Sequence, residues 1–500
     1  MKIVLNGLLV ISLFAALVIP AFAGDASDLT MKEEILKLQK IVLDLQNRIQ
    51  QLEEERAKTV TETSRTPRHV KRESRKEVRV QSAPPPPEAK AKAPSTPEKI
   101  ETAAAGTDAP APLQIGGQTV RVGIDGAIQL DVMHDFNALG LTPGGSLQRE
   151  FVTAEIPVGG PAAAITNRTG FSPNQSYLAG WAETDTPWGP LRVYADVNLM
   201  GSTTDAQFQI YKAYGQWGWL KAGLDYTLWL NQSAMPDTLD FEGPNAIPEV
   251  RFSQASLKIP LQPSANKRNF FFTLGVEDVA GDITTPPTPT GVPPTDKFVS
   301  VDQMPSVIGK LSYEPDWAHI EVGGMFRRLR VEGPGYDQSL NGWGLTLSGS
   351  VNSWKNDNFI WGVQYGDALG AYIQDTSGLG LDAAPTSKTN TAMKVIPAFG
   401  AWAAYQHWWT KSLRSSATYG FVRMDTDFDM YPNTANQGTY KQTQYASANL
   451  IWSPWPPFDV GLEYLFGHRT VTDSTAVDGS TTGVNHRVQF TMRWNFDYRR

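Results

Sequence analysis

The chain has 500 residues, a formal net charge of −7 at pH 7 and 19% charged residues, so it is long enough for several domains and too apolar to be wholly disordered. Its 44 lysines and arginines against 51 aspartates and glutamates leave no basic excess, which argues against a nucleic-acid partner. The absence of cysteine excludes disulfides, thiolate metal sites and a cysteine nucleophile. Abundant aromatic residues and glycine favour many short strands.

The first 23 residues have the pattern of a secretory signal peptide. Lys2 supplies positive charge, residues 4–19 are almost wholly apolar, and Ala21-Phe22-Ala23 has the small-x-small form of a cleavage site. An uncleaved anchor is the alternative, but the apolar stretch is short and ends at Pro20. No later stretch reaches the roughly 20 apolar residues of a membrane-spanning helix. The sequence therefore predicts export without a transmembrane helix.

Residues 24–57 predict a coiled-coil helix of about three heptads. The apolar residues that recur at its two core positions are Ile35, Val42 and Ile49, and Leu38, Leu45 and Leu52. The alternative is an amphipathic helix packed on its own domain, but the strict heptad repeat favours self-association. The helix alone does not decide between a dimer and a trimer.

Residues 58–112 predict a disordered linker, because they are rich in proline, alanine and charged residues and almost lack large apolar side chains. A basic run lies within it: Arg65, Arg68, Lys71, Arg72, Arg75, Lys76 and Arg79. Such a run is usually solvated, and the alternative is contact with the cell wall or with lipid head groups.

From residue 113 to 500 the sequence has the period of two that is typical of strands. Val120, Val122 and Ile124, for example, alternate with Arg121 and Asp125. Sixteen strands of about 10 to 14 residues are predicted, beginning near 119, 176, 189, 206, 219, 251, 267, 304, 317, 340, 357, 394, 411, 440, 456 and 484.

Three features favour a membrane barrel over a soluble β-rich domain. The strands are as long as the roughly 9 to 11 residues of a tilted bilayer crossing. Tryptophan gathers at the predicted turns, as at Trp188, Trp317 and Trp409, where an interfacial girdle would lie. Tight turns alternate with longer polar loops along the chain. The fold class predicted is an all-β transmembrane barrel of about 16 antiparallel strands, with an aqueous channel, in the outer membrane of a Gram-negative cell. The even strand count places the coiled coil and linker in the periplasm.

Five motifs carry a family resemblance: 175–178 (QSYL), 183–189 (ETDTPWG), 213–217 (AYGQW), 235–241 (MPDTLDF) and 444–452 (QYASANLIW). Together with the preceding helix they resemble the DcaP-like family of trimeric outer-membrane porins, over most of residues 113–500. The resemblance implies a sixteen-stranded homotrimer in outer-membrane lipid that passes small, often anionic solutes such as dicarboxylates. The chain departs from many outer-membrane barrels at its end, where Phe496 and Tyr498 precede two arginines.

No sequence motif indicates catalysis, a metal or a cofactor. GxSxG, P-loop, HExxH and EF-hand patterns are absent, and four histidines fall in different predicted strands: His319, His407, His468 and His486. The chain is therefore predicted not to be an enzyme. Two alternatives to a diffusive porin remain: a barrel hydrolase with residues converging at the rim, and an envelope tether for which the barrel is only an anchor. Deletion of residues 24–112 would distinguish the envelope tether from the porin, because a tether would lose envelope adhesion while a porin would keep its conductance.

Residues 231–250 are the predicted constriction loop. Prolines at 236, 244 and 248 stiffen the segment, and Trp229 and Phe241 can pack it against the wall. Its position after the fifth strand resembles that of the constriction loop in sixteen-stranded porins. The alternative is an ordinary external loop. The candidate residues are Asp237, Asp240, Phe241, Glu242 and Glu249.

A set of basic residues predicts a modest preference for anions. All but one of them fall at positions whose side chains are predicted to point into the barrel, and Arg251 lies where the constriction loop rejoins the wall. The residues are Arg121, Arg192, Lys221, Arg251, Arg414, Arg487 and Arg493. A guanidinium fork suits a carboxylate, so a basic ladder would orient a small dianion. The alternative is that these residues only pair with inward-facing aspartates to stabilise the lumen. The aspartates in question are Asp125, Asp131, Asp196 and Asp225.

Overall fold

The computed structural model describes residues 113–115, 118–140, 148–201, 206–262, 269–286, 298–333, 335–353, 356–387, 391–426, 430 and 437–499. The signal peptide predicted at 1–23, the coiled coil predicted at 24–57 and the linker predicted at 58–112 lie outside the described residues and stay predictions. Among the described residues, no helix combines the length and the hydropathy that a bilayer crossing requires.

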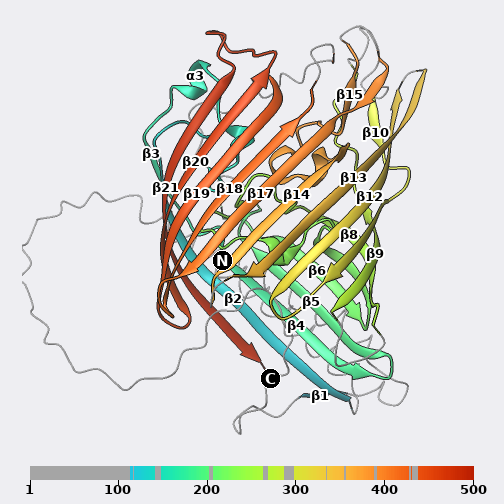
Figure 1. Ribbon diagram of the computed structural model, residues 1–500, viewed down its shortest axis with the longest axis vertical. Coiled ribbons are helices and arrows are strands. Elements are labelled where there is room, and N and C mark those ends of the chain that lie inside the picture. The colour runs from blue at the N-terminus through green and yellow to red at the C-terminus, as the bar shows by residue number, and fades with distance from the viewer. Residues whose placement is uncertain are drawn as a thin grey trace, which may run out of the picture. The chain divides into compact units, whose positions relative to one another are not determined.

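The described residues form strands joined by turns and loops, with a few short helical segments (Figure 1). The strands are β1 (Leu113–Ile115), β2 (Gln118–Asp135), β3 (Arg168–Ser172), β4 (Tyr177–Thr186), β5 (Gly189–Asn198), β6 (Gln209–Trp217), β7 (Leu220–Tyr226), β8 (Arg251–Pro260), β9 (Phe270–Asp278), β10 (Val299–Val301), β11 (Ser306–Tyr313), β12 (Ala318–Gly333), β13 (Tyr336–Asn352), β14 (Asn358–Asp367), β15 (Ala383–Pro385), β16 (Met393–Val395), β17 (Pro397–Trp408), β18 (Leu413–Met424), β19 (Thr439–Trp455), β20 (Phe458–Thr472) and β21 (Thr482–Arg499). The helical segments are η2 (Thr153–Glu155), α3 (Gly160–Ala163), η3 (Gln232–Ala234), η5 (Gly370–Tyr372) and η6 (Gln374–Thr376).

Sixteen of the described strands close into one antiparallel barrel. In wall order they are β2, β4 to β9, β11 to β14 and β17 to β21, each paired with the next. The last strand pairs with the first from Gly123↔Arg499 to Asp135↔Arg487, which closes the wall (Figure 1). The predicted strand number is confirmed, and each strand begins within four residues of its predicted start. The predicted lengths were too uniform, because β7 has only 7 residues while β2 and β21 have 18.

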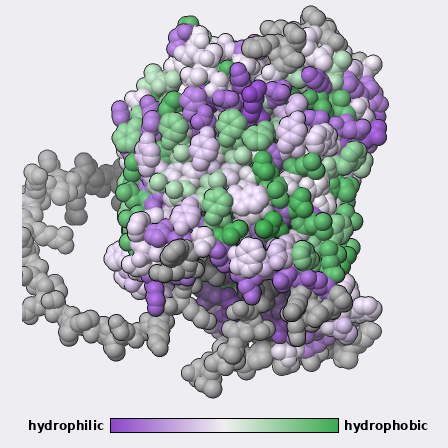
Figure 2. All heavy atoms as spheres, in the orientation of Figure 1, coloured by the Kyte–Doolittle hydropathy of each residue, from purple (hydrophilic) through white to green (hydrophobic). Residues whose placement is uncertain are grey.

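Apolar side chains cover the outer surface of the barrel, and polar side chains face its interior. In β2, Ile124 and Ile128 are 51% and 64% exposed while Gln129, Asp131 and Asp135 on the other parity are buried. The other strands with this alternation follow the same rule, and Figure 2 shows hydrophobic side chains across the middle of the visible face with hydrophilic ones towards its two ends. A water-soluble domain buries its apolar face, so an exposed apolar band on a closed barrel indicates a lipid-facing wall.

Aromatic side chains mark the short-turn rim of the barrel. Trp188, Trp317, Trp409 and Trp455 lie in or beside tight turns and are more than half exposed. Tyr and Trp rings favour the boundary between hydrocarbon and head groups because one edge of each is polar. This distribution agrees with the interfacial girdle that the sequence predicts.

Candidate functional site

The loop between β7 and β8, residues 227–250, enters the barrel and crosses it; it is called the crossing loop below. Near its start the indole nitrogen of buried Trp229 donates to the Gln364 side chain on β14 at 2.6 Å. The indole nitrogen of Trp402 on β17 donates to the Ala234 carbonyl at 2.9 Å. Neither β14 nor β17 neighbours β7 or β8 in the wall. The loop therefore spans the lumen, and its role as the constriction stays a prediction.

The middle of the crossing loop is fixed to the far wall. The backbone amides of Leu239 and Asp240 donate to one carboxylate oxygen of Glu463 on β20, at 2.6 and 2.9 Å. Asp237 accepts from Nε of Arg414 on β18 at 2.5 Å. Gly243 allows the following turn because its φ of 64° is costly for other residues. These contacts join the loop to wall strands that are far away in the sequence. They hold the loop in place across the lumen.

Two further loops, which the sequence analysis did not place in the lumen, pack beside it. Arg149, in the loop between β2 and β3, is 1% exposed, and its Nε donates to Asp131 at 2.9 Å. Asp375, in the loop after β14, accepts from Thr153 Oγ1 at 2.7 Å and from Tyr440 OH at 2.7 Å. The lumen position of Arg149 and of Asp375 could not be recognised from their neighbours in the sequence, because their partners lie in other parts of the chain.

The predicted basic residues face the barrel interior, and most of them are paired with carboxylates. Arg487 makes two bonds to Asp135, at 2.7 and 3.0 Å. Arg414 contacts Asp237 and Asp459, Arg493 contacts Asp459, Lys221 contacts Asp225, and Arg121 contacts Glu183 and Asp185. Arg192 lies over the Trp181 ring, and Arg251 lies 3.8 Å from the centre of the Tyr211 ring and donates to the Tyr211 carbonyl. The structure thus spreads these residues around the wall; their role in lining a pore stays a prediction.

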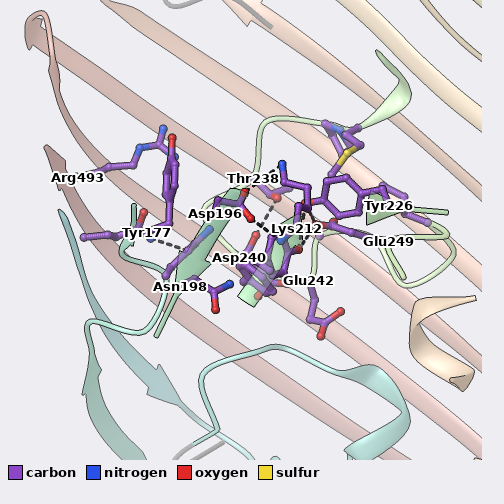
Figure 3. A pocket seen from close by; sticks show the side chains of 18 of the residues that line it. Tyr177, Asp196, Asn198, Lys212, Tyr226, Thr238, Asp240, Glu242, Glu249 and Arg493 are labelled. Carbon is purple, nitrogen blue, oxygen red and sulfur yellow. Dashed lines mark hydrogen bonds and ion pairs between the residues drawn. The ribbon is translucent and has the colours of Figure 1, made fainter. Parts of the chain in front are cut away.

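A cavity of about 330 Å³ lies between the crossing loop and the wall formed by β2, β4 to β7 and β21 (Figure 3). Its polar lining has five carboxylates and two cations: Asp125, Asp196, Asp240, Glu242, Glu249, Lys212 and Arg493. Its aromatic lining is Tyr177, Tyr194, Tyr211, Tyr226 and Phe241. Four of the five predicted constriction residues lie in this lining, and the fifth, Asp237, ties the loop to β18.

Two glutamates of the crossing loop, Glu242 and Glu249, have pKa values above the ordinary value. Burial raises the pKa of Glu249 to about 7, although hydrogen bonds from the Tyr226 and Tyr211 hydroxyls oppose the rise. Burial also raises the pKa of Glu242 well above its ordinary value. Four neighbouring carboxylates add to that rise: Glu150, Asp240, Glu249 and Asp375. The charge of the cavity therefore changes near neutral pH.

We expect the charge preference of the channel to depend on pH through Glu249. A carboxyl group with a pKa of about 7 is neutral at pH 6 and negative at pH 8, so the cation-to-anion permeability ratio should rise with pH. The charged and titratable groups that face Glu249 are Tyr211 and Lys212 on β6, Tyr226 on β7, Arg251 on β8 and Glu242 on its own loop. Reversal potentials across a salt gradient at pH 6, 7 and 8 measure this ratio. Glu249→Gln should flatten the rise and Asp337→Asn, at an exposed ion pair, should keep it; equal slopes would assign the pH effect elsewhere.

One of three comparisons with known proteins, that with solved structures, finds matches. No protein-family model matches the chain, and no curated protein matches it. Among solved structures, the outer-membrane channel DcaP of Acinetobacter baumannii matches with a TM-score of 0.62 and 17% identity, over 77% of this chain and 100% of that one. An anion-selective porin from Comamonas acidovorans (TM-score 0.43, 10% identity) covers 76% of this chain and 100% of its own. Salmonella typhi OmpF in complex with daunomycin (TM-score 0.42, 8% identity) covers 76% of this chain and 98% of its own. The chain therefore has the fold of the DcaP outer-membrane channel, as the motif resemblance predicts.

Proposed function

We propose that the protein is an outer-membrane porin through which small hydrophilic solutes diffuse passively. The observation that carries the proposal is a closed sixteen-stranded barrel with a lipid-facing apolar wall, whose polar interior is crossed by the crossing loop, with a cavity of about 330 Å³ between that loop and the wall. A barrel of this size leaves an aqueous lumen that side chains alone do not fill. The fold shared with DcaP supports the outer membrane as its location.

Recording from the purified full chain in a planar lipid bilayer tests the proposal. A porin gives stepwise, ohmic current increases in salt solution, and a homotrimer closes in three equal steps per insertion event. A barrel that inserts, shown by protease protection in the same vesicles, and carries no current would reject passive diffusion.

A preference for anions such as dicarboxylates is the finer proposal that the basic residues support. Arg251 carries most of that support, because no carboxylate lies within 4.0 Å of its guanidinium among the described residues. The ion pairs of Arg414 and Arg487 weigh against it, because a paired guanidinium has little remaining charge to offer a solute. Anion-selective reversal potentials that shift towards cations in Arg251→Ala would support this preference, and cation selectivity of the wild type would reject it.

We further propose that the helix at 24–57 lies in the periplasm and adds to a trimer held mainly by barrel packing. Polar substitutions at Leu38, Leu45 and Leu52 should then lower the temperature at which the trimer dissociates in detergent, while single-channel conductance is retained, because linked helices act only through effective concentration. Native gels after stepwise heating measure the dissociation. A variant that is monomeric before heating would make the helix the main determinant of the trimer.

A further inference from the structure

Long polar side chains that face the lumen are not equally accessible around the barrel. On β5 to β7 six of them are partly exposed, and together they are called the accessible wall: Arg192, Tyr194, Lys212, Tyr214, Gln216 and Lys221. The side chains of Lys212 and Lys221 are 20% and 26% exposed. Elsewhere in the described wall, these inward-facing side chains are buried: Lys310, Arg327, Gln364, Arg414, Glu463, Arg469, Arg487 and Gln489. Free space in the lumen therefore lies next to β5 to β7.

Three loops cover buried parts of the inner wall. The crossing loop accepts a hydrogen bond through its Leu239 carbonyl from Nε2 of Gln489, at 2.7 Å. The loop between β2 and β3 binds Arg487 through the carbonyl of Gln148, also at 2.7 Å. The loop after β14 supplies Asp375, which accepts hydrogen bonds from two side chains of β19. These bonds hold the three loops against the wall and keep its polar side chains away from a solute.

The cavity beside the crossing loop separates that loop from the accessible wall. Thr238 lines it from the loop, and Tyr194 and Lys212 line it from β5 and β6 (Figure 3). Tyr211, whose ring lies under the Arg251 guanidinium, lines it as well. The volume of about 330 Å³ lies within the roughly 300–1,000 Å³ of small-molecule sites. The crossing loop thus leaves space for a small solute on the side of the accessible wall.

Lys212 places a positive charge at the edge of this space. Within the described residues its one ion-pair partner is Asp196, at 3.3 Å, and its ammonium lies 5.2 Å from the ring centres of Tyr194 and Tyr226. Tyrosine faces attract an ammonium group within about 6 Å. Asp196 also accepts from the Tyr194 hydroxyl at 3.1 Å and from the Lys212 backbone amide at 2.5 Å. Because an ammonium group has three donors, this arrangement holds Lys212 in place and leaves it donors for a solute.

We infer that solutes pass the crossing loop along the accessible wall, and that Lys212 is a specificity-determining residue of this route. The inference rests on the proposed porin function and adds the course of the pore inside the barrel. Exposed charges act over only about 8 to 10 Å in physiological salt, so a charge has to line the route to select among solutes. Of the predicted basic residues, Arg192 and Lys221 then lie on the route. Arg414 and Arg487, which are buried, lie outside it.

Because the chain has no cysteine, a single introduced cysteine reports on its own position alone. Lys212→Cys is recorded in the full chain in a planar bilayer, before and after reaction with 2-sulfonatoethyl methanethiosulfonate, an anion, or 2-(trimethylammonio)ethyl methanethiosulfonate, a cation. Each reagent forms a disulfide with the cysteine and releases methanesulfinate. Loss of the lysine charge should shift the reversal potential in a salt gradient towards cation permeation; the cationic reagent should reverse this shift and the anionic one enlarge it. A reversal potential that neither the substitution nor the reagents change would overturn the role of Lys212.

Two further single cysteines locate the route. Ser416→Cys is the matched control, because Ser416 lies on β18 with the inward parity of Arg414 and is 2% exposed. Its thiol should react at least about tenfold more slowly than that of Lys212→Cys, since the reagents modify accessible thiols. Thr238→Cys, on the loop side of the cavity, should react as fast as Lys212→Cys, and it replaces that variant in the comparison if the loss of the lysine prevents folding. Reaction of Ser416→Cys as fast as either of them would overturn the route along the accessible wall.

The failure of this inference can be distinguished from failure of the porin function. A barrel that carries no ionic current in any salt contradicts the porin. A barrel that conducts salt, but whose current and reversal potential are unaffected by the reagents at Lys212→Cys and Thr238→Cys, leaves the porin intact and rejects the route.

Discussion

Removal of most of the crossing loop should raise the unit conductance several-fold. The loop joins β7 and β8, and Tyr226 and Arg251 at its two ends are paired directly across those strands. The Thr227 amide also donates to the Val250 carbonyl at 2.9 Å. A tight Asn-Gly turn can therefore replace residues 228–249 without displacing the wall. Because the loop crosses the lumen, its loss widens the narrowest section of the pore.

Single-channel conductance in concentrated potassium chloride measures this effect. A matched control shortens the loop between β20 and β21, where Val477 is 96% exposed and lies outside the lumen; its conductance should equal that of the wild type. Removal of the crossing loop also uncovers its apolar contacts with Trp402, so folding must be verified by the heat-dependent shift of the barrel on a gel. A folded variant with unchanged conductance would show that the crossing loop does not limit the current.

The wall of the barrel could be predicted from the sequence because every strand carries its own signal. Alternation with a period of two fixes which residues share a face, and tight turns with tryptophan mark one rim. For residues 231–250 the sequence favoured an inward course over an ordinary external loop, because Trp229, which the structure buries, can pack such a loop against the wall. These inferences use only neighbours in the sequence.

The partners inside the lumen could not be predicted in the same way. Parity places Arg487 inside, but its partner Asp135 is 352 residues away and is selected by the register of the closing pair of strands. Thr153 and Asp375 are 222 residues apart and meet only because two loops enter the same space. Period-two patterns contain no information on such pairings, so the sequence left open whether the inward-facing basic residues form a ladder or pair with aspartates.

The ion pair between Arg487 and Asp135 should contribute most to the stability of the seam that closes the barrel. Both side chains are essentially unexposed, and the guanidinium also donates to the backbone carbonyls of Arg149 and Gln148, at 2.8 and 2.7 Å. Arg487→Met leaves a carboxylate buried without its partner, and such a loss costs about 3–5 kcal/mol. We expect a correspondingly lower urea midpoint for the refolded barrel in detergent micelles.

Two further variants separate the buried charge from ordinary loss of packing. Arg330→Met removes an arginine from an exposed pair with Asp337, and its midpoint should hardly change because solvent already screens that pair. Asp135→Asn added to Arg487→Met removes the buried charge and should recover part of the lost stability. Recovery should be incomplete, because the carbonyls of Gln148 and Arg149 still lack their donor. If the double variant is as unstable as Arg487→Met alone, the loss comes from those carbonyls and from packing, and the unpaired carboxylate is not its cause.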